Sequence, residues 1–134
     1  MLKGKAVLVV GGDSGIGRSV AVLMAREGAD VLIVYLPEED AQDAKKMVEK
    51  VGRRVHLMAL DLRESKNCRS AVEEHMGAFG KLSVLANSSE FWAGVLVGRL
   101  LICDPCQARC KRSAMVSEIS NSMWWGRHTA RTYC

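Results

Sequence analysis

Between residues 5 and 87, short runs of β-branched residues alternate with amphipathic stretches of helical length. This alternation is typical of βαβ units, in which each helix connects two parallel strands. The expected strands comprise residues 6–10, 31–35, 55–60 and 82–86. The run 31–35 is nearly all apolar, as expected of a strand covered by helices on both faces. The pattern therefore predicts a three-layer α/β fold built on a parallel sheet.

The first two expected helices show both an apolar face and end signals. Val20, Leu23 and Met24 are spaced to form one face of the first helix. The second is predicted to begin at Pro37, because proline suits a first turn and the acidic residues 38–40 would face the positive end of the helix dipole. Its expected buried face consists of Ala41, Ala44, Met47, Val48 and Val51.

The third expected helix has apolar residues at spacings of three and four and ends at Gly80. Its expected buried residues are Cys68, Ala71, Val72, Met76 and Phe79. We interpret His75 as an ordinary position of this helix. Beyond residue 90 the alternation stops. A strand over 95–102 and a helix with one apolar side are equally compatible with the sequence, and that side would consist of Trp92, Val95, Leu96, Leu100 and Cys103.

A glycine-rich turn, Gly11-x-x-x-Gly15-x-Gly17, joins the first strand to the first helix. The first amides of a helix have no partners inside it, so a strand, a glycine turn and a helix in succession predict an anion site. The spacing differs from Gly-x-Gly-x-x-Gly. Residues 12–19 also fit the phosphate-loop pattern, except that Arg18 replaces its lysine, and Asp61 would then imitate a magnesium-holding acid. An ATP- or GTP-binding loop therefore stays open as an alternative.

Four motifs occur in register with these elements: Leu2-Lys3-Gly4-Lys5, the glycine turn, Asp61-Leu62, and Phe79-Gly80-Lys81-Leu82 leading to Asn87. Together they make residues 2–90 resemble the N-terminal half of a short-chain dehydrogenase/reductase, an NAD(P)-dependent oxidoreductase with a Rossmann fold. The string from Gly11 to Arg18 is most similar to glucose/ribitol dehydrogenase homologues and bacterial general-stress oxidoreductases. The resemblance implies a half-Rossmann domain with strand order 3-2-1-4 and right-handed crossovers.

The resemblance also implies roles for individual residues. The cofactor's pyrophosphate and ribose would be bordered by Gly11, Ser14, Gly15, Ile16 and Gly17. Asp61 would accept the adenine amino group with Leu62 beside it, and Asn87 would lie at the nicotinamide end. The chain departs from the family pattern where Val10 replaces a threonine and residues 88–90 replace a small, apolar continuation.

The choice between NAD and NADP depends on charge at the end of the second strand. An NAD site places an acid there, which accepts the ribose hydroxyls and repels a 2'-phosphate. Tyr35 occupies that position, whereas Arg18 could pair with a 2'-phosphate, so NADP is favoured over NAD. Glu38 is the counter-argument, since a longer turn would let it act as the missing acid.

The family's catalytic residues have no counterpart in the chain. Hydride transfer in the family uses a tyrosine with a lysine four residues on, and a serine, but no Tyr-x-x-x-Lys occurs in the 134 residues. A phenol with its ordinary pKa near 10 is a poor base at neutral pH. We therefore expect residues 1–90 to be a truncated NAD(P)-binding domain that is inactive alone.

Residues 91–134 differ sharply in composition from the part before them. Residues 1–90 hold 13 basic and 13 acidic residues, whereas 91–134 hold 6 and 2, and with them the whole net charge of +4. Four of the five cysteines and all three tryptophans also lie there. A shifted reading frame, a retained intron or a mispredicted gene would explain this tail.

The tail leaves two further hypotheses open. A metal site would use Cys103, Cys106 and Cys110 with His128 or Cys134 as the fourth ligand, although only half a zinc signature is present. A nucleic-acid contact would use basic residues beside Trp124 and Trp125, but no nucleic-acid-binding motif accompanies them.

The remaining expectations concern location and partners. No secretory signal or membrane span is found, so a cytoplasmic protein without a membrane partner is expected. A sheet that ends at its fourth strand would leave an apolar edge, which the tail or a second copy of the chain would cover.

Overall fold

A computed structural model describes residues 1–88 and the backbone of residues 99–102. The elements follow the predicted alternation and are, in chain order, β1 (Ala6–Val10), α1 (Gly15–Arg26), β2 (Asp30–Tyr35), α2 (Gln42–Lys50), β3 (Val55–Ala59), α3 (Ser65–Phe79), β4 (Val84–Asn87) and β5 (Arg99–Ile102).

The sheet has the order β3-β2-β1-β4-β5. Its first four strands are parallel, which confirms the predicted order 3-2-1-4. Of the coverings expected for the edge beyond the fourth strand, the tail is the one observed, because β5 pairs antiparallel with β4, from Val84 opposite Ile102 to Asn87 opposite Arg99. The strand that the sequence allows over residues 95–102 is therefore observed over Arg99–Ile102.

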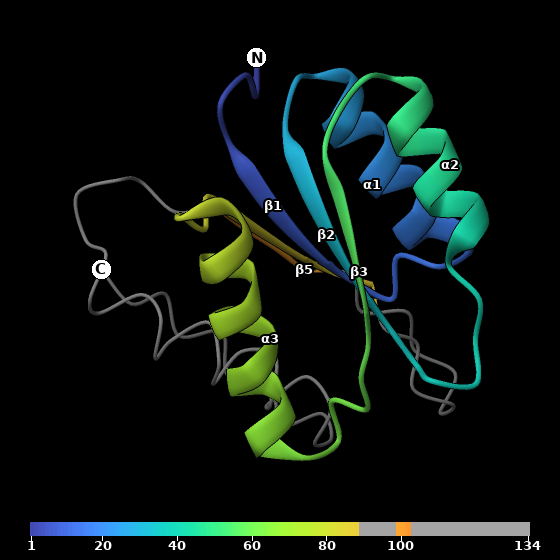
Figure 1. The fold of residues 1–134 in the computed structure, drawn as a ribbon, viewed down its shortest axis with the longest axis vertical. Coiled ribbons are helices and arrows are strands. Elements are labelled where there is room, and N and C mark those ends of the chain that lie inside the picture. Colours follow the sequence, from blue (N-terminus) through green and yellow to red (C-terminus); the bar gives the residue numbers. More distant parts are fainter. Residues whose placement is uncertain (89–98, 103–134) are drawn as a thin grey trace.

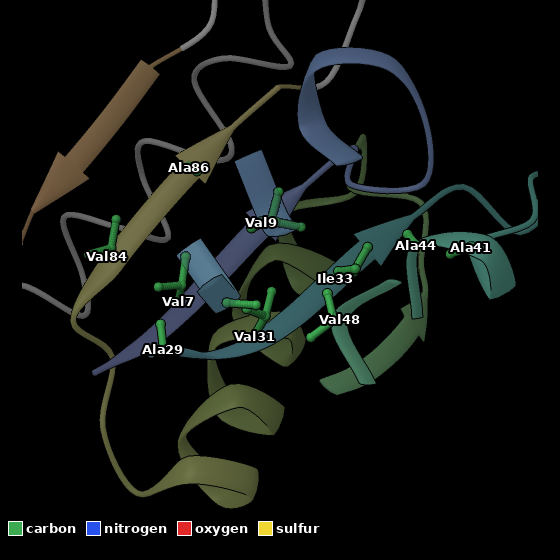
Figure 2. Close-up of a cluster of buried hydrophobic side chains, with 12 residues drawn as sticks. Val7, Val9, Ala29, Val31, Ile33, Ala41, Ala44, Val48, Val84 and Ala86 are labelled. Atoms are coloured by element: carbon green, nitrogen blue, oxygen red, sulfur yellow. The ribbon is translucent and has the colours of Figure 1, made fainter. Parts of the chain in front are cut away.

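The sheet is covered on both faces, with α1 and α2 on one side and α3 on the other (Figure 1). Successive strand residues point to opposite faces, so the central strands divide their side chains between two cores. Val7, Val9, Val31 and Ile33 belong to the core under α1 and α2, which also includes Ala44 and Val48 of α2 (Figure 2). The other core, under α3, includes Leu8, Val10, Leu32, Val34 and Leu62. Burial on both faces explains why β1 and β2 are nearly continuous apolar runs.

Helix α1 packs through small residues rather than through the predicted face. Its buried residues are Gly17, Ala21 and Ala25. Val20 and Met24 are partly buried, but Leu23 is 57% exposed, so its predicted place in the apolar face is wrong. A face of glycine and alanine lets the helix backbone approach the sheet closely, which matters for the turn before it.

Helix α2 begins five residues later than predicted. Residues 36–39 form a turn closed by a hydrogen bond from the Glu39 amide to the Leu36 carbonyl (2.9 Å). The Asp40 carboxylate then accepts a hydrogen bond from the Gln42 amide (2.9 Å) at the first residue of the helix. The acidic residues 38–40 therefore precede α2, and of its predicted stripe Met47 is 46% exposed.

At the amino edge of the sheet, the buried Asp30 joins the starts of β2 and β3. One carboxylate oxygen pairs with Arg53 Nη2 at 2.6 Å and the other with Arg54 Nη2 at 2.5 Å. Burial alone would raise the pKa of Asp30, but the hydrogen bond from Arg54 and the charges of both arginines outweigh it and lower that pKa. The stability that this group contributes is therefore present above its ordinary pKa of 3.8 and is lost as the pH falls through the lowered value.

Asp30→Asn is expected to lower the free energy of unfolding by about 2 kcal/mol at neutral pH, because it leaves two arginines without their shared counter-charge. Urea denaturation measures this change. Asp43→Asn is the matched control: the pair between Asp43 and Lys46 spans 3.6 Å with both side chains more than 70% exposed, so a loss below about 0.5 kcal/mol is expected. Equal losses of unfolding free energy in Asp30→Asn and Asp43→Asn would contradict the stabilising role of the Asp30 ion pairs.

Candidate functional site

The carboxyl ends of the parallel strands meet at one edge of the sheet. The register pairs Val10 with Val34 on one side and with Asn87 on the other, and it pairs Tyr35 with Ala59. The segments that follow β1, β2 and β3 therefore leave the sheet side by side, with Asn87 closing β4 beside them. This edge is where doubly wound α/β proteins bind ligands, and we call it the carboxyl edge.

The glycine turn begins this edge and is tied to the neighbouring strand. The Gly11 amide donates a hydrogen bond to the Val34 carbonyl of β2 (2.8 Å). Gly11 has a φ of 70° and Gly15 a φ of 51°, a region that other residues rarely adopt. The sequence signal for the turn thus corresponds to real backbone requirements at both positions.

Gly17 brings the first turn of α1 into contact with the turn before it. A Cβ atom at Gly17 would lie 1.8 Å from the Gly11 carbonyl oxygen and 2.7 Å from its carbon. No side chain fits in that space, so the helix begins directly against the glycine turn. The first amides of α1 therefore lie at the carboxyl edge, where they can receive an anion.

The other predicted residues of the turn surround this helix start. Ser14 is the N-cap of α1, and its side chain makes no capping hydrogen bond. Ile16 is 55% exposed, and Arg18 is partly buried one residue after Gly17. The first turn of α1 carries no acidic residue that would oppose an anion.

The fourth strand is fastened to this turn through the backbone. The Ser88 amide donates a hydrogen bond to the Val10 carbonyl (2.9 Å), directly after Asn87. Val10 has no side-chain hydroxyl that could hydrogen-bond to β4. The connection between the turn and the end of β4 is therefore this backbone hydrogen bond. Asn87 itself is buried, with 6% of its surface exposed.

Asp61 and Leu62 follow β3 but differ in accessibility. The Asp61 side chain is 29% exposed, whereas Leu62 is 2% exposed and belongs to the core under α3. The Cys68 thiol donates a hydrogen bond to the Leu62 carbonyl (3.2 Å), and the Asn67 side-chain amide (Nδ2) donates one to the Asp61 carbonyl (2.6 Å). Of the predicted pair, only Asp61 can present its side chain to a ligand.

Arg63 holds the Asp61 carboxylate, and sequence reasoning missed it. Its backbone amide donates to Asp61 Oδ1 (2.9 Å), its Nε lies within 3.0 Å of both carboxylate oxygens, and its Nη2 is 2.5 Å from Oδ2. The side-chain hydrogen bond from Arg63 is the main cause that holds the pKa of Asp61 below its usual value. Opposite charges two residues apart in a loop were the available signal.

The segment after β2 lies next to this pair. The Leu60 amide donates a hydrogen bond to the Tyr35 carbonyl (2.8 Å), which places the turn 36–39 beside residues 60–63. Tyr35 is partly buried against the core under α1 and α2, while Glu38 is exposed. The carboxyl edge thus brings Tyr35, Glu38, Asp61 and Arg63 together.

Two further hypotheses concern other sites. Within residues 1–88, no group of three or more histidine, cysteine or acidic side chains is arranged to hold a metal ion. The cysteine site and the basic aromatic contact predicted for 103–134 lie outside the described residues. None of the described helices has the length and apolar character needed to cross a membrane.

Comparison with protein families gives a match over most of the chain. The family model described as short chain dehydrogenase matches residues 5–100. The chain is 54% identical over 87 residues to the uncharacterized oxidoreductase YghA of Escherichia coli (strain K12), covering 63% of this chain and 30% of that protein. It is 49% identical over 89 residues to general stress protein 39 of Bacillus subtilis (strain 168), covering 66% and 31%.

A third relative is the glucose and ribitol dehydrogenase homolog 2 of Arabidopsis thaliana, 39% identical over 93 residues, with 64% of this chain and 32% of that protein covered. The two groups named by the predicted resemblance are therefore both found, and the resemblance is confirmed. The chain spans about a third of the length of these relatives.

Solved structures share the fold. A short chain dehydrogenase from Burkholderia cenocepacia J2315 in complex with NADP matches with a TM-score of 0.68 and 30% identity, covering 90% of this chain and 51% of that one. A short chain dehydrogenase from Mycobacterium paratuberculosis bound to NAD matches with a TM-score of 0.57 and 30% identity, covering 63% and 36%.

Proposed function

Because the chain belongs to the short-chain dehydrogenase family, we propose that its carboxyl edge binds a nicotinamide adenine dinucleotide. The observation that carries this proposal is the contact between Gly17 and the Gly11 carbonyl, which brings the start of α1 against the glycine turn. Backbone amides at a helix start, free of side-chain obstruction, suit a pyrophosphate.

The proposed contacts follow the edge from β1 to β4. Gly11, Ser14, Gly15, Ile16 and Gly17 border the pyrophosphate and its ribose. Asp61 accepts the adenine amino group, and Leu62 contributes only backbone because its side chain is in the core. Asn87 lies at the nicotinamide end. When bound, the dinucleotide would supply a hydride-transferring nicotinamide.

For the cofactor, we favour NADP over NAD. Tyr35 ends β2 where an NAD-binding protein would place an acid, and a phenol neither repels nor neutralises a 2'-phosphate. Arg18 supplies a positive charge beside the glycine turn. The matched structures hold NADP in one case and NAD in the other, so the preference proposed for this chain rests on its own residues Tyr35 and Arg18.

We also propose that these 134 residues bind the dinucleotide without turnover. The chain offers no Tyr-x-x-x-Lys pair. Without a lysine to lower its pKa, a tyrosine does not deliver a proton efficiently at neutral pH. In this proposal, the described residues bind and orient the cofactor but do not act on a carbonyl substrate.

Isothermal titration calorimetry of the purified chain tests the binding proposal. Saturable 1:1 binding of NADP⁺ and NAD⁺ is expected, with no comparable heat from Mg-ATP. Tight binding of Mg-ATP together with no binding of either dinucleotide would contradict the proposal and favour the phosphate-loop hypothesis.

A further inference from the structure

Arg63 is the one basic residue in the two turns that flank the ends of β2 and β3. Residues 36–40 and 60–63 otherwise contribute four acidic side chains, Glu38, Glu39, Asp40 and Asp61. The Arg63 side chain is 64% exposed, and within the described part of the chain its guanidinium is held by a single carboxylate, that of Asp61. The Arg63 guanidinium can therefore exchange the Asp61 carboxylate for another anion and still lie at the carboxyl edge.

The contacts between Arg63 and Asp61 occupy the whole carboxylate. A new hydrogen-bond donor can therefore reach Asp61 only if the Arg63 side chain gives up part of it. A carboxylate offers about four lone-pair positions. Arg63 already makes two contacts with Oδ1, through its backbone amide and Nε, and two with Oδ2, through Nε and Nη2. An amino group that is to donate to Asp61 therefore has to replace the Arg63 side chain at one of the two oxygens.

The charges around Arg63 determine what the displaced side chain can do next. Its side-chain hydrogen bond to Asp61 is the main cause that raises the pKa of Arg63, followed by the charge of Asp61, and the Glu38 carboxylate adds to the same shift. Glu38 therefore lies within electrostatic reach of the guanidinium. Without Arg63, the acids of the two turns would act unopposed on any anion that approaches them.

We propose that Arg63 adds to the charge of Arg18 in setting the preference for a 2'-phosphorylated dinucleotide, by exchanging the Asp61 carboxylate for the phosphate when the adenine amino group occupies Asp61. This inference rests on the proposed function. With NADP, the displaced guanidinium gains a phosphate, which it can bind through two parallel hydrogen bonds. With NAD it gains no anion, so its loss of Asp61 is not compensated.

The exchange is energetically accessible because the pair to be broken is exposed. Surface ion pairs contribute little to stability, since water screens both partners. The backbone hydrogen bond from Arg63 to Asp61 does not depend on the side chain. Arg63→Ala therefore removes the cation while keeping the turn that positions Asp61.

The test measures NADP⁺ and NAD⁺ affinities of Arg63→Ala by calorimetry. A loss of about tenfold in NADP⁺ affinity is expected, which is one good charge-assisted contact, with NAD⁺ affinity changed less than about twofold. Arg26→Ala is the matched control, because it removes the same charge from an exposed residue in the last turn of α1, at the opposite edge of the sheet. It is expected to leave the affinity ratio unchanged.

Arg63→Lys keeps the charge but not the planar guanidinium. Its ratio of NADP⁺ to NAD⁺ affinity is expected to lie between those of the wild type and Arg63→Ala. Adenosine 2',5'-bisphosphate compared with 5'-AMP is expected to show the same loss in Arg63→Ala, which isolates the 2'-phosphate. Unfolding midpoints within error of the wild type establish that each variant is folded.

Equal losses for NADP⁺ and NAD⁺, or an unchanged ratio in a chain that binds both, would overturn the inference and leave the proposed function standing. No binding of either dinucleotide by the wild-type chain would overturn the proposed function and, with it, the inference.

Discussion

Gly17→Ala is expected to lower the free energy of unfolding by more than about 3 kcal/mol and to abolish dinucleotide binding. The new Cβ would lie 1.8 Å from the Gly11 carbonyl oxygen and 3.2 Å from the Gly12 Cα, and all of these atoms are backbone. Relief of the clash requires α1 to move away from the turn, which would disturb both the buried Ala21 contacts and the anion site. Urea denaturation and calorimetry measure the two effects.

Gly77→Ala is the matched control for this substitution. Gly77 lies in α3, is exposed, and a Cβ there would meet no atom of the described residues within 4 Å. Alanine is the better helix former, so an increase in stability of about 0.5–1 kcal/mol is expected, with dinucleotide affinity unchanged. A Gly17→Ala variant that is as stable as Gly77→Ala and still binds NADP⁺ would contradict the described packing of the turn.

His75 is expected to make the fold sensitive to mild acid. The side chain is fully buried on α3, its ring contacts Phe79 edge-on with centroids 5.1 Å apart, and neither ring nitrogen has a hydrogen-bond partner among the described residues. Burial is the main cause that lowers the pKa of His75 from 6.5 to about 4, and the nearby Lys81 backbone acts in the opposite direction. The folded state therefore holds His75 neutral while the unfolded state protonates it.

The sign of the effect follows from this difference. Between its two pKa values the unfolded chain binds more protons, so stability is highest above pH 6.5 and is lost as the pH falls to about 4, by roughly 3 kcal/mol in total. His75→Leu is expected to remove this part of the pH dependence. Urea denaturation at a series of pH values measures it as the difference in slope between wild type and variant.

Gly77→Ala serves again as the control, since a change in the same helix that spares His75 should shift the whole stability curve without altering its slope. Parallel pH profiles of the wild type and His75→Leu would show that His75 is not the responsible group.

The architecture could be predicted well because its signals are local. β1 and α3 begin or end where the sequence indicates, and Gly80 caps α3 in the left-handed conformation with a φ of 71°. The wrong predictions concern features that depend on tertiary packing. Leu23 fits a helical stripe by spacing, yet the sheet accepts only the small face of α1. For residues 95–102 the sequence is equally compatible with a helix and a strand, and the pairing with β4 that decides for the strand β5 has no local signal.

In the candidate site, too, some features could be predicted from the sequence and others could not. The glycine turn and Asp61 are visible in the sequence because backbone conformation and strand order fix them. The burial of Leu62 and of His75 depends on side-chain packing, for which single-residue patterns carry no signal. The pair between Arg63 and Asp61 is signalled only by opposite charges two residues apart in a loop.

The most direct measurement is a titration of the nitrogen-15-labelled chain with NADP⁺, followed by amide chemical shifts. The account predicts that the changes concentrate in residues 11–18, at Tyr35, in residues 61–63 and at Asn87, while the amino edge around Asp30 and Arg53 stays unchanged. A spectrum that does not change at saturating NADP⁺, or one that changes mainly at the amino edge, would contradict the claim that the carboxyl edge binds a dinucleotide.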